Sequence, residues 1–148
     1  MDYAALKSEL AKPAYAGLSD AEAASAVNAA TVSVVKPVRS EDVRDYLMVI
    51  GKWPRIAAIA RGLIAGSDAE KLASVALVEA LALKESFNLS VPAYAAAVDA
   101  QLDACASAGL ITGPDKAAIV GLKDNDVPLP DLLGEIVLPE HVTKARAA

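Results

Sequence analysis

Apolar residues recur at helical spacing along most of this chain. Tyr3, Leu6 and Leu10 lie on one face of a first predicted helix, over residues 2–12, which Pro13 ends. Farther along, serine, threonine, glycine and proline stand where the apolar periodicity starts and stops. The same criteria therefore predict further helices over residues 20–30, 40–50, 54–63, 92–108, 113–122 and 139–146.

Several of these helix starts carry capping residues. Ser19 is followed by Glu22, and Ser67 by Glu70, which is the spacing of a capping box. Ser40 is the predicted N-cap of the helix over residues 40–50, with acidic residues next to it that favour a helix N-terminus.

One stretch, residues 68–86, is apolar on almost every side of the helix that it predicts. Such a helix is expected in the interior of a protein, and its apolar run is shorter than the roughly 20 residues that cross a bilayer. We therefore predict an all-α fold, a compact bundle of six or seven helices around this central apolar helix. We expect a single helical domain over residues 1–148, with a short C-terminal helix or tail from about residue 138.

Two segments, near residues 31–38 and 125–138, depart from helical periodicity. The first is rich in β-branched residues, which favour an extended chain, and Pro37 restricts it to an edge strand or a plain extended segment. Glu135–Leu138 is its candidate strand partner, and residues 123–130 are predicted to form a loop. Either both segments fold back over the helices, or they contact neighbouring copies. In the second case the subunit interface contains Val32, Val34, Val35, Val38, Val127, Leu129, Ile136, Val137 and Leu138.

The charge of the chain argues against nucleic-acid binding. Nineteen acidic residues against 14 basic ones give a net charge of −5, which repels a phosphate backbone, and no basic cluster reverses it locally. The single cysteine, Cys105, cannot form an internal disulfide. The N-terminal residues lack the basic and apolar regions of a signal peptide. We therefore expect a cytoplasmic chain without a sequence-specific nucleic-acid or membrane partner.

The two reactive side chains of the sequence are isolated from one another. His141 is the only histidine, so it has no second imidazole with which to bind a metal, and we expect it to be exposed near the chain end. Cys105 lies on the apolar face of its helix, towards the C-terminal end, where the dipole opposes a thiolate. A buried structural cysteine is therefore predicted.

The acidic clusters also lack the pattern of a functional site. A calcium loop that starts at Asp124 would have Pro128 and Leu129 at its fifth and sixth positions, where an oxygen ligand and a glycine are needed. Asp42 and Asp45 fall on the outer face of their predicted helix. No phosphate-binding loop, dinucleotide fingerprint, nucleophile elbow or zinc-protease motif occurs. We predict no enzyme, no metal site and no cofactor.

A helix-turn-helix is disfavoured by spacing. About nine residues separate the helices over residues 20–30 and 40–50, whereas that motif uses a turn of three or four. The second helix also begins with Glu41 and Asp42, where phosphate contacts would fall.

The segment Tyr15–Asn28, YAGLSDAEAASAVN, resembles the N-terminal part of a family of small helical proteins encoded by tailed bacteriophages and prophages. Members open with a short helix and then carry Tyr-x-Gly-Leu/Met-Ser/Thr-Asp-Ala-Glu-Ala-Ala, ending in Leu-Asn or similar. Val27 stands here where leucine is more usual. The C-terminal LPEHVTKAR, Leu138–Arg146, is similar to the tail of that family. The resemblance covers both ends, and residues 31–38 depart from it.

The resemblance implies a virion protein with no catalytic residues to transfer. By analogy with other small helical phage proteins, it implies a head–tail connector, or adaptor, that forms a homo-oligomeric ring under the portal. The partners would be copies of the chain and portal, capsid or tail proteins, assembled in the host cytoplasm. The alternative is a regulatory helical module that binds one host or phage protein in the infected cell and is absent from particles.

Overall fold

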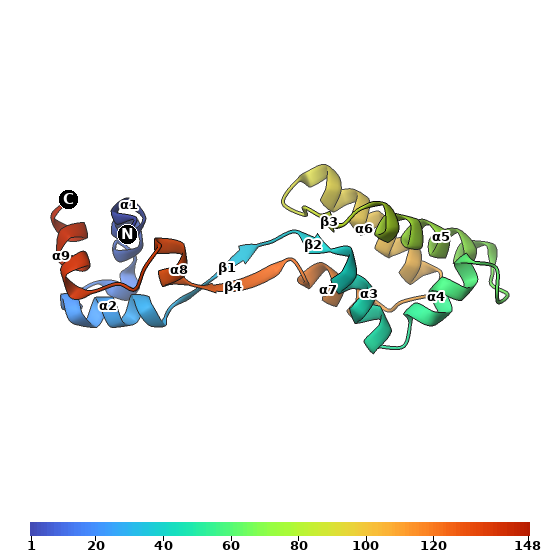
Figure 1. Cartoon of the computed structure of the whole chain (residues 1–148), viewed down its shortest axis with the longest axis horizontal. Helices are drawn as coiled ribbons and strands as arrows, with labels where there is room; N and C mark the ends of the chain where they lie inside the picture. The colour runs from blue at the N-terminus through green and yellow to red at the C-terminus, as the bar shows by residue number, and fades with distance from the viewer. The chain divides into compact units, whose positions relative to one another are not determined.

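The computed structural model describes residues 1–148, and helix is its main secondary structure (Figure 1). A 3₁₀ turn, η1, covers Pro13–Tyr15. The other elements are α1 (Tyr3–Leu10), α2 (Asp20–Ala29), β1 (Thr31–Val35), β2 (Val38–Arg39), α3 (Ser40–Val49), α4 (Trp53–Ala60), α5 (Asp68–Leu83), β3 (Ser86–Phe87), α6 (Pro92–Ser107), α7 (Gly113–Gly121), β4 (Asp124–Pro128), α8 (Leu129–Leu133) and α9 (Pro139–Ala147). None of these helices is both long and apolar enough to span a bilayer.

The chain forms two compact units. The terminal unit combines Met1–Val34 with Asp126–Ala148, and the inserted unit is the continuous segment Val35–Asn125. Each unit has its own cluster of buried apolar residues, and the two clusters have no residue in common. We expected a single domain around one core. The structure instead has two cores. No residue of the inserted unit, α5 included, belongs to the buried cluster of the terminal unit.

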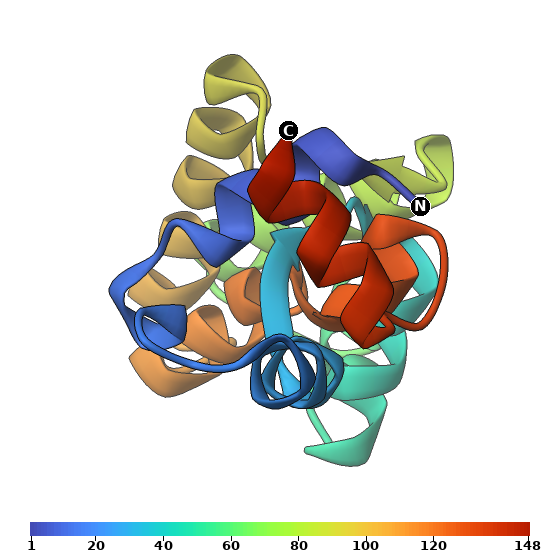
Figure 2. The ribbon, with the colours of Figure 1, turned by 90° about the vertical axis from the view of Figure 1, so that its left-hand side faces the viewer.

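The terminal unit is built from both ends of the chain. Helix α9 packs against α1 and α2, and α8 packs against α2 and α1; Figure 2 shows α9 and α1 next to each other. Alanine on α2 allows these helices to approach closely, as expected for small side chains at a helix contact. The buried residues are Leu6, Tyr15, Ala23, Ala24, Val27, Leu129, Leu133, Val137, Val142 and Ala145.

Asn28 fixes the extended segment that precedes α9. Its side-chain amide donates to the carbonyl oxygen of Val137, and its side-chain oxygen accepts from the Val137 N–H, each at 2.8 Å. The Val137 side chain is buried. Both backbone polar groups of this residue are therefore satisfied by one side chain from α2.

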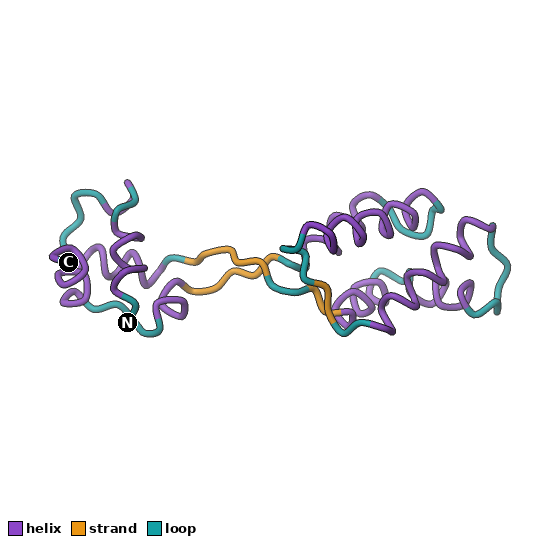
Figure 3. Tube along the Cα trace, turned by 90° about the horizontal axis from the view of Figure 1, so that it is seen from above, coloured by secondary structure: helices purple, strands orange, loops and turns teal.

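The inserted unit is organised around α5, which packs against α4, α6 and α3. Its buried residues are Val38, Val43, Leu47, Ile56, Ile59, Ala73, Leu77, Leu81, Leu102, Cys105, Leu110, Ile111 and Ile119. Strands β2 and β3 pair antiparallel, with Val38 opposite Phe87 and Arg39 opposite Ser86. A second strand pair, β1 with β4, is longer, and both pairs are visible in Figure 3.

The prediction that other helices wrap the central apolar helix on all sides is wrong. Helix α5 ends at Leu83 rather than near residue 86, and it buries one face only. Leu72 is 75% exposed and Leu83 is 83% exposed. The helices α3, α4 and α6 are too few to cover the whole circumference of α5, so part of its apolar surface faces solvent.

The fold is mostly helical rather than strictly all-α, because β1 and β4 form a two-stranded ribbon. At its ends, the Leu129 N–H donates to the Ala30 carbonyl at 2.9 Å and the Lys36 N–H to the Lys123 carbonyl at 2.8 Å, in antiparallel order. The expected loop over residues 123–130 is therefore wrong, and so is the pairing of residues 31–38 with Glu135–Leu138. In both strands the half-buried residues, Val32 and Val127 among them, alternate with exposed neighbours, as expected for a ribbon with one half-buried face.

Two predicted capping boxes are confirmed and one predicted cap is wrong. Ser19 with Glu22 and Ser67 with Glu70 each form the reciprocal pair of hydrogen bonds. Ser40 is the first residue of α3 rather than its cap, and its hydroxyl donates to the Lys84 carbonyl. Because the β2–β3 pairing brings this carbonyl close, a tertiary hydrogen bond replaces the local cap.

Candidate functional site

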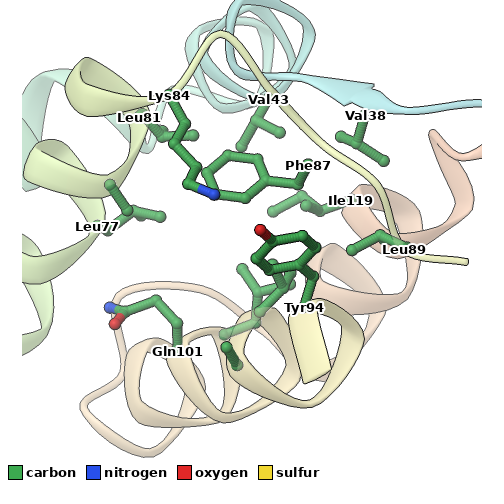
Figure 4. A pocket seen from close by; sticks show the side chains of 14 residues that line it. Val38, Val43, Leu77, Leu81, Lys84, Phe87, Leu89, Tyr94, Gln101 and Ile119 are labelled. Carbon is green, nitrogen blue, oxygen red and sulfur yellow. The ribbon is translucent and has the colours of Figure 1, made fainter. Parts of the chain in front are cut away.

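The inserted unit contains an apolar pocket of about 370 Å³ (Figure 4). We call it the apolar pocket; its lining residues are Val38, Val43, Leu77, Ala80, Leu81, Lys84, Phe87, Leu89, Tyr94, Ala97, Val98, Gln101, Leu102 and Ile119. Eleven of these 14 side chains are apolar, so most of the wall offers only dispersion contacts. A volume of this size lies within the range of about 300–1,000 Å³ that is typical of binding pockets.

Helical periodicity places two walls of the pocket. On α5, Leu77 and Leu81 are one turn apart and face the same side. On α6, Ala97, Val98 and Gln101 supply the facing wall by the same spacing. Alanine at position 97 leaves space that a larger side chain would fill, which contributes to the width of the pocket.

The remaining wall comes from segments distant in sequence. The β2–β3 pairing places Val38 opposite Phe87, and α3 and α7 add Val43 and Ile119. Val38, Val43 and Ile119 are buried, whereas Phe87 is half-buried. The pocket therefore depends on the tertiary structure of the whole inserted unit rather than on one local motif.

Three polar side chains lie among these apolar groups. The Lys84 ammonium group is 4.3 Å from the centre of the Tyr94 ring, a cation–π distance, and Figure 4 shows Lys84 extending beside the Phe87 ring. The Gln101 amide donates to the Ala73 carbonyl at 3.3 Å. Lys84 takes part in no ion pair. The pocket thus combines an apolar interior with one unpaired cation.

Neither the single cysteine nor the single histidine of the chain lines the pocket. Cys105 lies behind the wall, fully buried, and its thiol donates to the Ala73 carbonyl at 3.9 Å. Burial raises the pKa of this thiol, which disfavours the nucleophilic thiolate. The prediction of a buried structural cysteine is confirmed. No group of three or more potential ligand side chains is arranged to hold a metal ion.

The expectation of an exposed His141 is wrong. Its exposed fraction is 9%, its ring meets the Tyr3 ring edge-on with centroids 6.1 Å apart, and its Nδ1 accepts the Leu138 N–H at 3.2 Å. The first turn of α9 rotates the side chain towards α1, so the histidine stabilises a helix start in the terminal unit.

The structure distributes the nine predicted interface residues among three environments. Val38 belongs to the core of the inserted unit, and Leu129 and Val137 to the core of the terminal unit, so these three cannot meet a partner without unfolding. Val32, Val34 and Val127 are half-buried on the ribbon. The accessible ones are Val35, 52% exposed, Ile136, 67% exposed, and Leu138, 46% exposed. The interface itself stays a prediction.

Sequence reasoning missed both the pocket and several exposed apolar side chains of the inserted unit. These are Met48, Val49, Leu63, Ile64, Leu72, Leu83, Val91 and Tyr94. Val49 stands at the end of α3 directly after Met48. Adjacency alone gave no signal of exposure, because the neighbours Ile56 and Ala57 are both buried on α4.

The chain matches no family model, no curated protein and no solved structure. The resemblance to tailed-phage proteins therefore stays a prediction.

Proposed function

We propose that this chain is a structural assembly protein of a tailed-phage particle, acting through apolar contacts with copies of itself and with other particle proteins. The observation that carries the proposal is the amount of large apolar surface left exposed in a chain that already has two well-packed cores. Val49, Leu72 and Leu83 are 86%, 75% and 83% exposed. Leu72 and Leu83 lie on one helix, α5, and apolar side chains that gather into a patch on a surface mark protein-interaction sites.

The β1–β4 ribbon adds backbone groups that are available to bind a neighbouring chain. Strands β1 and β4 pair only with each other, so each keeps one edge with unpaired N–H and C=O groups. Unpaired edges accept a strand from a neighbouring chain. Two-stranded ribbons are marginally stable alone, so such a neighbour would also stabilise this one.

The segments Tyr15–Asn28 and Leu138–Arg146 connect an assembly role to phage particles through their resemblance. A head–tail connector of adaptor type, ring-shaped and homo-oligomeric, is the form that we favour. The protein would then be located in the virion after assembly in the host cytoplasm.

Quantitative mass spectrometry of particles purified from the host that carries the gene tests this proposal. We expect the chain in the particles at several copies per portal, and retained through a density gradient. A chain abundant in the lysate, bound there to one partner and absent from particles, would contradict the proposal and identify the regulatory binding module instead. A ring also predicts a copy number that is fixed from one preparation to the next.

A further inference from the structure

The segment before α9 presents two apolar side chains in a fixed conformation. Val137 is held by two hydrogen bonds to Asn28 and its side chain is buried. Because side chains alternate along an extended backbone, Ile136 and Leu138 point outward when Val137 points inward. They are 67% and 46% exposed. We call these two side chains the knob.

The preceding and following residues give the knob an acidic border. Glu135 and Glu140 bracket it in the sequence, and both are exposed. The Glu135 carboxylate forms an ion pair with the N-terminal amine of Met1 at 2.8 Å, so Glu140 is the free charge of this border. Glu140 forms no ion pair within the chain. Because the knob is anchored before it meets a partner, an interface that uses it loses little conformational entropy on binding.

The apolar pocket of the inserted unit has the complementary properties. Its interior is apolar, and Lys84 is an unpaired cation at its wall. A neighbouring polar depression shares Lys84 and Leu81 with it and contributes Arg44, which also lacks an ion pair. Glu85 is the opposing charge there, so the two cations outnumber the single free carboxylate.

The volumes are also compatible. A cavity of about 150 Å³ holds one benzene molecule, so a pocket of about 370 Å³ has room for the two branched side chains of the knob. A knob with acidic neighbours and a pocket with cationic neighbours attract one another and disfavour contacts between two knobs or two pockets.

We propose that the Ile136 and Leu138 side chains of one copy insert into the apolar pocket of a second copy. This inference rests on the proposed function and names the contact through which copies assemble. The knob belongs to the terminal unit and the pocket to the inserted unit, so the contact is heterologous: every copy offers one of each. Heterologous contacts repeat from copy to copy and generate closed rings or filaments.

Two variants test the knob and the apolar pocket independently. I136D places a charge on the knob, and A97W fills the pocket from a solvent-exposed position of α6. Each has a matched control: L132D alters an exposed leucine of α8 in the terminal unit, and A96W adds the same indole to the neighbouring residue of α6, which does not line the pocket. Circular dichroism and urea unfolding of all four verify the fold.

Sedimentation velocity of each variant and of mixtures is the test. We expect I136D and A97W alone to weaken self-association at least about tenfold, while L132D and A96W associate as the wild type does. An equimolar mixture of I136D and A97W should form a dimer of about 30 kDa and nothing larger, twice the 15.2 kDa chain. In that dimer the intact knob of A97W occupies the intact pocket of I136D, and no further copy can be added.

Several results would overturn the inference. If both variants associate like the wild type, copies join through another surface, and the proposed function is unaffected. If the mixture stays monomeric while the wild type associates, knob and pocket do not bind each other. A wild-type chain that stays monomeric, with a co-purified amphiphile or another particle protein in its pocket, would assign the pocket to that occupant; the particle inventory would then decide the proposed function separately.

Discussion

Ser74 is a buried hydroxyl without a hydrogen-bond partner, on the face of α5 that meets the core. Ser40 is equally buried, but its hydroxyl donates to the Lys84 carbonyl. The two serines therefore differ in whether their buried hydroxyl group forms a hydrogen bond, and this difference affects the free energy of unfolding.

Substitution of each serine by alanine should change stability in opposite directions. We expect Ser74→Ala to raise the free energy of unfolding by about 1 kcal/mol, since it removes an uncompensated polar group. We expect Ser40→Ala to lower it by about 1–2 kcal/mol, because the Lys84 carbonyl loses its donor. Urea unfolding followed by circular dichroism measures both. A destabilised Ser74→Ala variant would mean that the hydroxyl has a partner in solution.

Asn28 is the second residue whose contribution can be isolated. Asn28→Ala leaves both the N–H and the C=O of Val137 without a partner in a half-buried setting, and should lower the free energy of unfolding of the terminal unit by about 1–3 kcal/mol. Ser25→Ala, on an exposed position of the same helix, is the control and should change it by less than about 0.5 kcal/mol. Equal unfolding curves for Asn28→Ala and the wild type would remove the basis for a rigid knob.

At the scale of elements, the capping box of α5 gives the fold a pH dependence. The Ser67 N–H donates to the Glu70 carboxylate at 2.8 Å, and the Arg55 guanidinium forms an ion pair with it. The Ser67 hydrogen bond first, and then Arg55, hold the pKa of Glu70 below its ordinary value of 4.5. A carboxylate whose pKa falls on folding stabilises the fold above the unfolded-state pKa, and this contribution is lost as the pH falls through the lower, folded-state pKa.

Glu70→Gln should therefore be less stable than the wild type at neutral pH, and this difference should shrink as the pH is lowered below about 4.5. Thermal unfolding at several pH values between roughly 7 and 3 measures this difference. Glu79→Gln, on an exposed position of α5 without an ion pair, is the control and should not reproduce this dependence. A difference that is constant with pH would contradict the assignment.

The helices were predictable because their signals are local. Ser19 with Glu22 and Ser67 with Glu70 mark helix starts within four residues of sequence, and both pairs form in the structure. The β1–β4 pairing was missed because it joins residues far apart in the sequence, for instance Ala30 and Leu129, which are 99 positions apart, and several apolar segments offered comparable β-branched character. Periodicity shows that a strand has one buried face, but it does not specify which strand pairs with it.

The apolar pocket could not be predicted for a related reason. Its wall combines Val38, Val43, Leu77 and Ile119, from four elements that adjoin only in the folded unit. Hydrophobic residues of a pocket and of a core have the same pattern in a sequence. A pocket residue differs from a core residue because no side chain packs against its exposed side. Only the folded structure shows whether such a packing partner is present.

At the scale of the whole molecule, the division into two units has a consequence for folding. The inserted unit, Val35–Asn125, has a core made only from its own residues, whereas the core of the terminal unit combines Leu6 and Val27 with Leu133 and Val142 from the other end of the chain. A fragment over residues 35–125 should therefore fold alone, with a helical circular dichroism spectrum and a cooperative thermal transition. A fragment over residues 1–34 should be unfolded. A non-cooperative 35–125 fragment would contradict the division.

If the exposed apolar surface of this chain joins it to further copies, its mass in solution depends on concentration. Sedimentation equilibrium of the full-length chain over a wide concentration range tests this, because it reports mass independently of shape. We expect an average mass that rises above 15.2 kDa towards a defined multiple as the concentration increases. An average mass that stays at 15.2 kDa over the whole range would contradict the claim.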